Sequence, residues 1–151
     1  MSRFPGTVVL QKDPQLRSQD GSIRPDRMRP LFDAALCSLC GTKTATEAWK
    51  KLLSPGDIIG IKVNCLSGRL LSTRPELVAA MTDSLAEAGV PKKRIIIWDR
   101  TSRELVEAGF AIRTSGEGPL CFGTDQVGYE RRLSFSGEVG SCLSKILTRS
   151  V

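Results

Sequence analysis

The chain has 151 residues, and its content of 40% hydrophobic and 25% charged residues is typical of a folded domain and excludes a disordered chain. Its longest apolar run is too short to cross a bilayer, and no signal core or twin-arginine pair opens it, so a cytoplasmic protein is expected. The net charge of +6 would suit nucleic acid, but only 5% of the residues are aromatic and no zinc-finger or helix-turn-helix spacing occurs. A small anionic ligand is therefore the preferred partner, and nucleic acid is not expected.

The first part of the chain is predicted to contain one strand and two helices. Residues 7–10 form a short apolar run that predicts a strand, and residues 15–25 are predicted to be an irregular arm. An apolar stripe at helical spacing then predicts a helix that ends at Gly41 (Met28, Leu31, Phe32, Ala35, Leu36 and Leu39). The sequence from Thr44 to Glu47 has the form of a capping box and predicts the start of a second, short helix.

The five cysteines of the chain are an odd number without a secretory context, so a disulfide framework is not expected. Cys37 and Cys40 have the spacing of metal ligands. The chain contains no histidine and no second cysteine pair at this spacing, and both residues fall in the first predicted helix. We therefore predict that they pack as small apolar side chains, and no metal site is predicted.

The middle of the chain is predicted to form a right-handed βαβ unit of strand 58–63, helix 74–88 and strand 94–98. Thr73 and Glu76 have the form of a capping box at the start of this helix. Both strands are nearly continuous apolar runs, which favours a mostly parallel sheet with helices on both faces.

The last third of the chain gives a weaker signal. A short helix is predicted from Ser102 to Ala108, a strand at residues 120–122, a loop rich in glycine and serine at residues 123–141, and a final helix from Ser141 to Thr148. The fold class expected is a single α/β domain over residues 1–151, or the N-terminal part of a longer domain.

Polar residues follow both strands of the predicted βαβ unit. Lys62 and Asn64 end the first strand, and Asp99 and Arg100 end the second. Because parallel strands place their carboxyl ends at one edge of the sheet, we expect these residues to meet there, where open α/β sheets bind ligands.

Lys62 alternates with apolar neighbours and is expected on the same face as Gly60, whose missing side chain allows a close approach. A lysine in this position can hold an anion, act as a general base or form an ion pair with Asp99, and both the functional and the structural interpretation are open. Arg69, in the loop after the first strand, and Arg74, at the start of the helix, can add anion contacts. Cys65 is a weaker candidate for a nucleophile because no histidine is present to activate it.

The motifs GIKVN at residues 60–64 and WDR at residues 98–100, with the sequence around them from Ala48 to Tyr129, resemble the family called domain of unknown function 362. Some members carry or accompany ferredoxin-type iron–sulfur clusters, and many are about twice as long as this chain. The resemblance implies that the chain corresponds to the N-terminal half of such a protein and that an iron–sulfur protein is a candidate partner. The clustered cysteine motif of the iron–sulfur members is absent here, so cluster binding is not carried over.

The expected function is binding of a small carboxylate or phosphate at the carboxyl edge of the sheet, and the cofactor, if there is one, is unknown. If the protein is an enzyme, we expect proton transfer or redox chemistry rather than hydrolysis. Lys62 and Asp99 are the candidate catalytic residues, and the candidate ligand-binding residues are Asn64, Arg69, Arg74 and Arg100. The alternative is a non-catalytic accessory module of an iron–sulfur or electron-transfer system.

Overall fold

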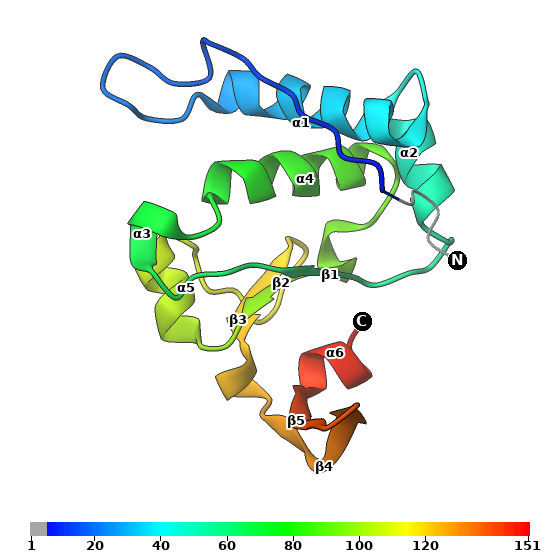
Figure 1. Ribbon diagram of the computed structural model, residues 1–151, viewed down its shortest axis with the longest axis vertical. Helices are drawn as coiled ribbons and strands as arrows, with labels where there is room; N and C mark the ends of the chain where they lie inside the picture. The colour runs from blue at the N-terminus through cyan, green and yellow to red at the C-terminus, as the bar shows by residue number, and fades with distance from the viewer. Residues whose placement is uncertain (1–5) are drawn as a thin grey trace. The chain divides into compact units, whose positions relative to one another are not determined.

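The structure, a computed structural model, describes residues 6–151. The chain divides into two compact units (Figure 1). The first contains the chain up to Pro55 together with Glu76–Val90, and the second contains Gly56–Pro75 together with Pro91–Val151. Mixed helices and strands and a parallel sheet agree with the predicted α/β class. Among the described residues, no helix is both long and apolar enough to span a membrane.

The first unit is helical. It contains α1 (Pro25–Cys40), α2 (Ala45–Leu52) and most of α4 (Pro75–Glu87). Both predicted signals near the α1–α2 turn are confirmed: Gly41 adopts a left-handed conformation with φ of 60°, and the capping box of Thr44 and Glu47 is formed. The polar contacts inside the unit include Trp49 Nε1 donating to Ser84 Oγ at 2.9 Å.

The strand predicted at residues 7–10 is wrong, because this segment joins no sheet among the described residues. Its side chains Val8 and Leu10 are largely exposed. The apolar run has no neighbouring strand and no core to pack against, and local propensity alone does not hold a strand. Cys40 is buried among the helices of this unit, as predicted, and Cys37 is half-buried.

The second unit is built on a three-stranded parallel sheet in the order β1-β2-β3, with a separate two-stranded hairpin. Its elements in chain order are β1 (Ile59–Lys62), α3 (Gly68–Leu71), η1 (Lys92–Arg94), β2 (Ile95–Asp99), α5 (Ser102–Ala108), β3 (Leu120–Gly123), η2 (Thr124–Gln126), β4 (Tyr129–Ser136), β5 (Val139–Ser144) and α6 (Lys145–Arg149). The parallel pairing of the strands predicted at 58–63 and 94–98 is confirmed, with Ile59 beside Ile95 and Lys62 beside Trp98.

One face of this sheet packs on α6. Ile96 and Phe122 form a buried cluster with Ile146 of α6, and Trp98 and Leu120 pack against it. By register, Gly60 and Lys62 lie on the same face as Ile96 and Trp98. The predicted close approach at Gly60 is made by Val151, whose Cγ1 lies 3.0 Å from the point where a β-carbon on Gly60 would stand.

The predicted helix at Ser102–Ala108 and the strand at 120–122 are confirmed as α5 and β3. The loop predicted over residues 123–141 is wrong from residue 129 onward, where β4 and β5 pair as an antiparallel hairpin. The final helix begins at Lys145 rather than Ser141, because residues 139–144 are taken up by β5.

Candidate functional site

The carboxyl ends of the three parallel strands lie side by side at one edge of the sheet, and all of the predicted site residues belong to the second unit. Beyond the ends of the ladder, the backbone N–H of Val63 donates to the carbonyl of Trp98 at 3.0 Å. This bond keeps the two chain segments together for one further residue. It therefore brings the loop after β1 next to the loop after β2.

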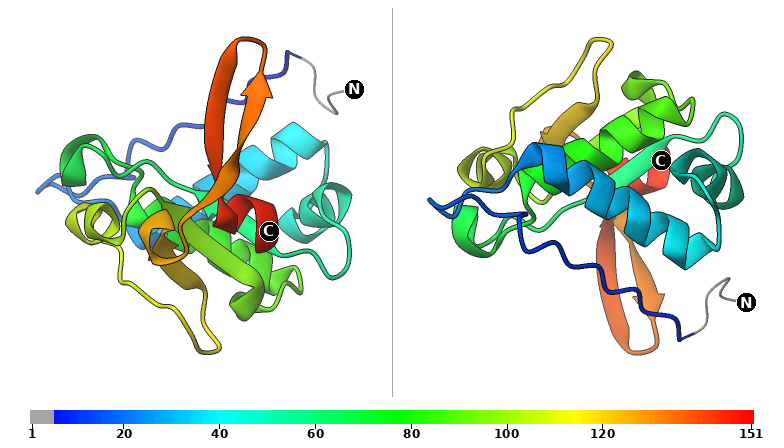
Figure 2. Two further views of the ribbon diagram at one scale, coloured as in Figure 1. Left: turned by 90° about the horizontal axis from the view of Figure 1, so that it is seen from below. Right: turned by 90° about the horizontal axis from the view of Figure 1, so that it is seen from above.

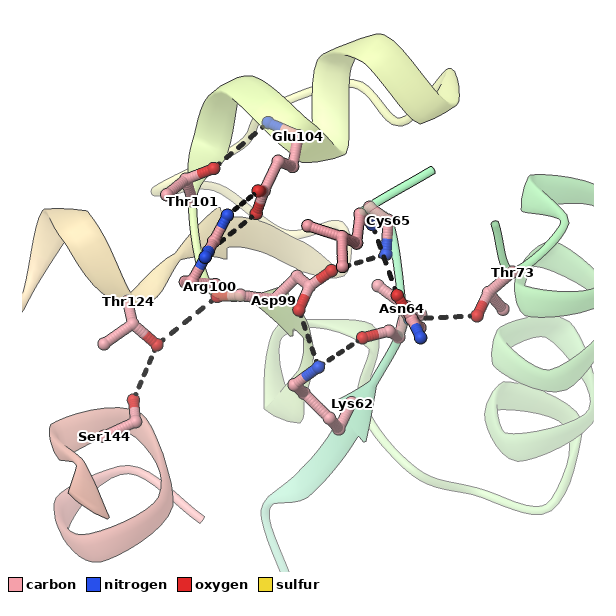
Figure 3. A network of polar contacts seen from close by, with 12 residues as sticks. Lys62, Asn64, Cys65, Thr73, Asp99, Arg100, Thr101, Glu104, Thr124 and Ser144 are labelled. Carbon is pink, nitrogen blue, oxygen red and sulfur yellow. Dashed lines mark hydrogen bonds and ion pairs between the residues drawn. The ribbon is translucent and has the colours of Figure 1, made fainter. Parts of the chain in front are cut away.

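Lys62 and Asp99 form an ion pair at this edge, with 2.6 Å between Nζ and Oδ1 (Figure 3). The side chain of Lys62 is 49% exposed, whereas that of Asp99 is only 7% exposed. The ammonium group also donates to the carbonyl oxygen of Val63 and lies 5.6 Å from the centre of the Trp98 ring. The pair predicted from the sequence is thus present, with its cation half-open to solvent and its carboxylate covered.

Asp99 accepts hydrogen bonds at both carboxylate oxygens. Oδ2 accepts from the backbone N–H of Cys65 at 2.6 Å, while Oδ1 is held by Lys62. Burial alone would raise the pKa of this carboxyl, but the hydrogen bonds from Lys62 and from the backbone N–H groups of Arg100 and Cys65 outweigh burial and lower the pKa below its usual value. Asp99 is therefore a stable anion that fixes two chain segments.

Cys65 is buried, and its thiol is held in the protonated form. Burial and the nearby Asp99 carboxylate together raise the pKa of this thiol to about 12, and Lys62 acts in the opposite direction. A nucleophilic cysteine needs a lowered pKa, because the thiolate is the reactive species. The residue therefore contributes its backbone N–H to the site rather than its sulfur.

Arg100 does not join Asp99 but pairs with Glu104, one helical turn away in α5. Arg100 Nε donates to Glu104 Oε2 at 3.3 Å, and its terminal nitrogen Nη2 contacts Oε1 (Figure 3). The pairing repeats the pattern of Lys62 and Asp99, because Arg100 is 59% exposed and Glu104 only 6%. The hydrogen bond from Arg100 lowers the pKa of Glu104, and the same contact raises the pKa of Arg100.

Sequence reasoning missed Glu104. Two features of the sequence could have found it: its position four residues after Arg100, which suits an ion pair on a helix, and its position three residues after the helix cap Thr101. The hydroxyl of Thr101 accepts the backbone N–H of Glu104 at 3.2 Å. The glutamate side chain is therefore held at the start of α5, next to the end of β2.

The other three predicted residues organise the loop after β1. Asn64 accepts the N–H of Leu66 with its side-chain oxygen at 3.2 Å. The guanidinium of Arg74 donates to the carbonyl of Arg69 at 2.9 Å. The side chain of Arg69 lies against Gly109: a β-carbon added to Gly109 would stand 3.6 Å from Nε of Arg69. These contacts shape the loop, and none of them places Asn64, Arg69 or Arg74 on the Lys62–Asp99 pair.

The loops after β2 and β3 are held together by a second polar network. Asp125 Oδ1 accepts the backbone N–H of Ser102 at 2.9 Å, and Ser102 Oγ accepts the N–H of Gly123 at 3.0 Å. Thr124 Oγ1 contacts both the carbonyl of Asp99 and the hydroxyl of Ser144 (Figure 3). Side chains that bond to backbone groups therefore hold the loops at the carboxyl edge of the sheet, where Lys62 and Arg100 lie.

The site thus presents two cations, each oriented by a buried carboxylate. Such an arrangement can donate hydrogen bonds to an anion that approaches from solvent. Within residues 6–151, no group of three or more cysteine, aspartate or glutamate side chains is arranged to hold a metal ion.

A scan against protein-family models, a search of curated proteins and a search of solved structures each found no match to the chain. The resemblance to domain of unknown function 362 therefore stays a prediction. It rests on residues 60–64 and 98–100, which are the segments that carry Lys62, Asp99 and Arg100.

Proposed function

We propose that the second unit binds a small anionic ligand, a carboxylate or a phosphate, at the carboxyl ends of β1 and β2. The observation that supports this most directly is the pairing of exposed cations with buried carboxylates. Lys62 and Arg100 are about half open to solvent, whereas their partners Asp99 and Glu104 are covered. A cation that is already oriented loses less side-chain entropy when it meets a ligand.

Asp99 serves in this proposal as a restraint on Lys62 and not as an acid or base. A general base works best when its pKa lies near the working pH, and the pKa of Asp99 is lowered. Because each cation already has a carboxylate partner, we expect modest affinity that falls as salt concentration rises.

A thermal-melting screen of the whole chain against small carboxylic acids, inorganic phosphate and nucleotides tests the proposal. A compound that binds is expected to raise the melting temperature of the wild-type protein and to have no effect on Lys62→Met. Lys93→Met is the matched control, because Lys93 is exposed and its ion-pair partner Glu117 is exposed as well. The proposal is wrong if Lys62→Met keeps the full ligand-induced shift, or if no compound shifts the wild-type protein.

The second candidate is a non-catalytic accessory module of an iron–sulfur or electron-transfer system. It is favoured by the fact that both cations already have partners, since such pairs also occur as purely structural contacts. Iron and sulfide analysis of the purified protein, together with co-purification of an iron–sulfur partner, is the measurement that would support it.

The finer prediction about the fold also stays a proposal: a right-handed βαβ connection through helix 74–88, with helices on both faces of the sheet. It is supported by the parallel pairing of β1 with β2, because adjacent parallel strands require a crossover connection and such crossovers are almost always right-handed.

A further inference from the structure

The β4–β5 hairpin is a two-stranded sheet of its own, joined to no other strand among the described residues. It forms a twisted ribbon whose turn points away from α6 (Figure 2). Ser136 pairs with Val139, which leaves a two-residue turn of Gly137 and Glu138. Gly137 has a φ of 61°, a conformation that suits glycine at the first position of a hairpin turn. All side chains from residue 131 to residue 142 are exposed.

One face of this hairpin is apolar. The register places Leu133 beside Cys142 and Phe135 beside Gly140, so these four residues share a face. The Phe135 ring lies across Gly140, where a β-carbon would come within 2.7 Å of it. Leu133 is 49% exposed and Phe135 69% exposed. Two-stranded hairpins are marginally stable alone in water, so an apolar face of this kind gains stability when it is covered.

The charges at the two ends of the hairpin have opposite signs. Arg131 and Arg132 lie at the base of β4, and Glu138 lies in the turn. None of the three makes an ion pair within residues 6–151. At about 3.4 Å per residue, Arg131 lies roughly 10 Å from Ser134, the midpoint of the apolar face, and the turn lies at a similar distance on the other side.

We propose that this face binds the same face of a second copy of the chain. A two-fold axis running across the strands near Ser134 would place Phe135 of each copy on Leu133 of the other. The same axis would bring Glu138 of each copy to Arg131 of the other, since Arg131 shares the face of Leu133 and Arg132 points to the opposite face. A surface that is apolar at its centre and carries opposite charges at equal distances on its two sides is complementary to itself under this symmetry.

Sedimentation and light scattering of the whole chain from about 1 μM to about 500 μM test the proposal, because an interface of this size is expected to be weak. We expect a concentration-dependent dimer. Phe135→Ser should raise its dissociation constant at least about tenfold, as loss of a central aromatic anchor does. Ser134→Ala, on the opposite face of the same strand, is the matched control and should leave the constant unchanged. Circular dichroism checks that each variant keeps its fold.

Charge exchange tests the symmetry without altering the apolar face. Glu138→Arg alone, and Arg131→Glu alone, should each weaken the dimer, because each places like charges opposite one another. The combined variant with both changes should restore association. A monomer at every concentration overturns the proposal, as does a dimer that is insensitive to Phe135→Ser or that the combined variant fails to restore.

Discussion

Asp99 shows at the residue scale how one carboxylate can hold two segments of a chain together. It receives the Lys62 ammonium, the N–H of Cys65 and the N–H of Arg100. The first two lie at the end of β1 and in the loop after it, and the third follows Asp99 directly in the chain. The side chain therefore joins two strands at the point where the sheet ends.

Replacement of Asp99 by asparagine is expected to lower the free energy of unfolding by about 1–3 kcal/mol, the usual cost of leaving buried hydrogen-bonding groups poorly matched. Urea unfolding measures the change. Glu117→Gln is the control, because Glu117 is exposed and its contact to Lys93 spans 3.5 Å. Equal effects of the two substitutions would contradict the role given to Asp99.

The cysteines are expected to differ sharply in reactivity. Burial raises the pKa of Cys121 to about 11, and burial with the Asp99 charge raises that of Cys65 to about 12. A pKa three units above its usual value makes the thiolate fraction roughly a thousandfold smaller near neutral pH. Cys142, which is exposed, should react first with a thiol reagent, and Cys65 and Cys121 only after unfolding. Mass mapping of labelled peptides checks the order, and early labelling of Cys65 would contradict it.

At the scale of the elements, the backbones of β3 and of the loop before α5 approach each other closely at Gly123. A β-carbon on Gly123 would stand 2.2 Å from the backbone nitrogen of Ser102 and 2.4 Å from the carbonyl carbon of Thr101. Only a residue without a side chain lets the two backbones approach in this way.

Gly123→Ala is therefore expected to destabilise the protein by about 1–3 kcal/mol, as overpacking against fixed backbone does. Gly60→Ala is the matched control. It also lies in a strand of the same sheet, but the atoms nearest to its β-carbon would belong to the side chain of Val151, the first at 3.0 Å, and this side chain can move. Thermal melting of both variants measures the difference. A Gly60→Ala variant as unstable as Gly123→Ala would show that the backbone contact is not the cause.

The elements with a packed apolar side could be predicted from the sequence. The stripe of α1 and the apolar runs of β1 and β2 are such cases, because burial of their side chains selects the structure. The β4–β5 hairpin could not be predicted from the sequence, since its side chains are exposed and no core imposes an apolar pattern on them. The strand expected at residues 7–10 fails for the opposite reason, because a suitable local sequence has no partner.

The same distinction applies to the site. The meeting of Lys62 and Asp99 follows from the parallel order of two strands, so the sequence was sufficient to predict it, while the ion pair was one of several roles left open for Lys62. The orientation of Arg100 toward Glu104 depends on the angle at which α5 leaves β2, which no strand pattern specifies. Long cationic side chains have several partners within reach, and only the fold selects among them.

At the scale of the whole molecule, several carboxyl groups are more acidic in the folded protein than usual. Hydrogen bonds from Ser18 and Ser22 lower the pKa of Asp20 to about 2, and contacts from Arg149 and Thr148 lower that of Glu130 to about 2. The pKa values of Asp99 and Glu104 are also lowered. In the unfolded chain such groups bind protons near pH 4, before they do so in the folded protein.

The unfolded state thus binds more protons in acid, so the free energy of unfolding should fall as the pH drops from about 5 toward 2. Between about pH 5 and 7 these carboxyl groups should contribute little change to the free energy of unfolding. Urea midpoints across this range measure the effect. Glu130→Gln should flatten part of the acid dependence, because it removes the carboxylate that pairs with Arg149 at 2.7 Å. A stability that rises on acidification would contradict the prediction.

The three strands of the parallel sheet are complete long before the helix that packs on them. Ile146 of α6 covers the face formed by β2 and β3, and Val151 lies over Gly60 of β1. On the ribosome, this face must therefore stay open to water until residues 145–151 have left the exit tunnel. Completion of the second unit thus requires residues 145–151, and a nascent chain stalled before residue 145 should be recognised by chaperones that bind exposed apolar strands.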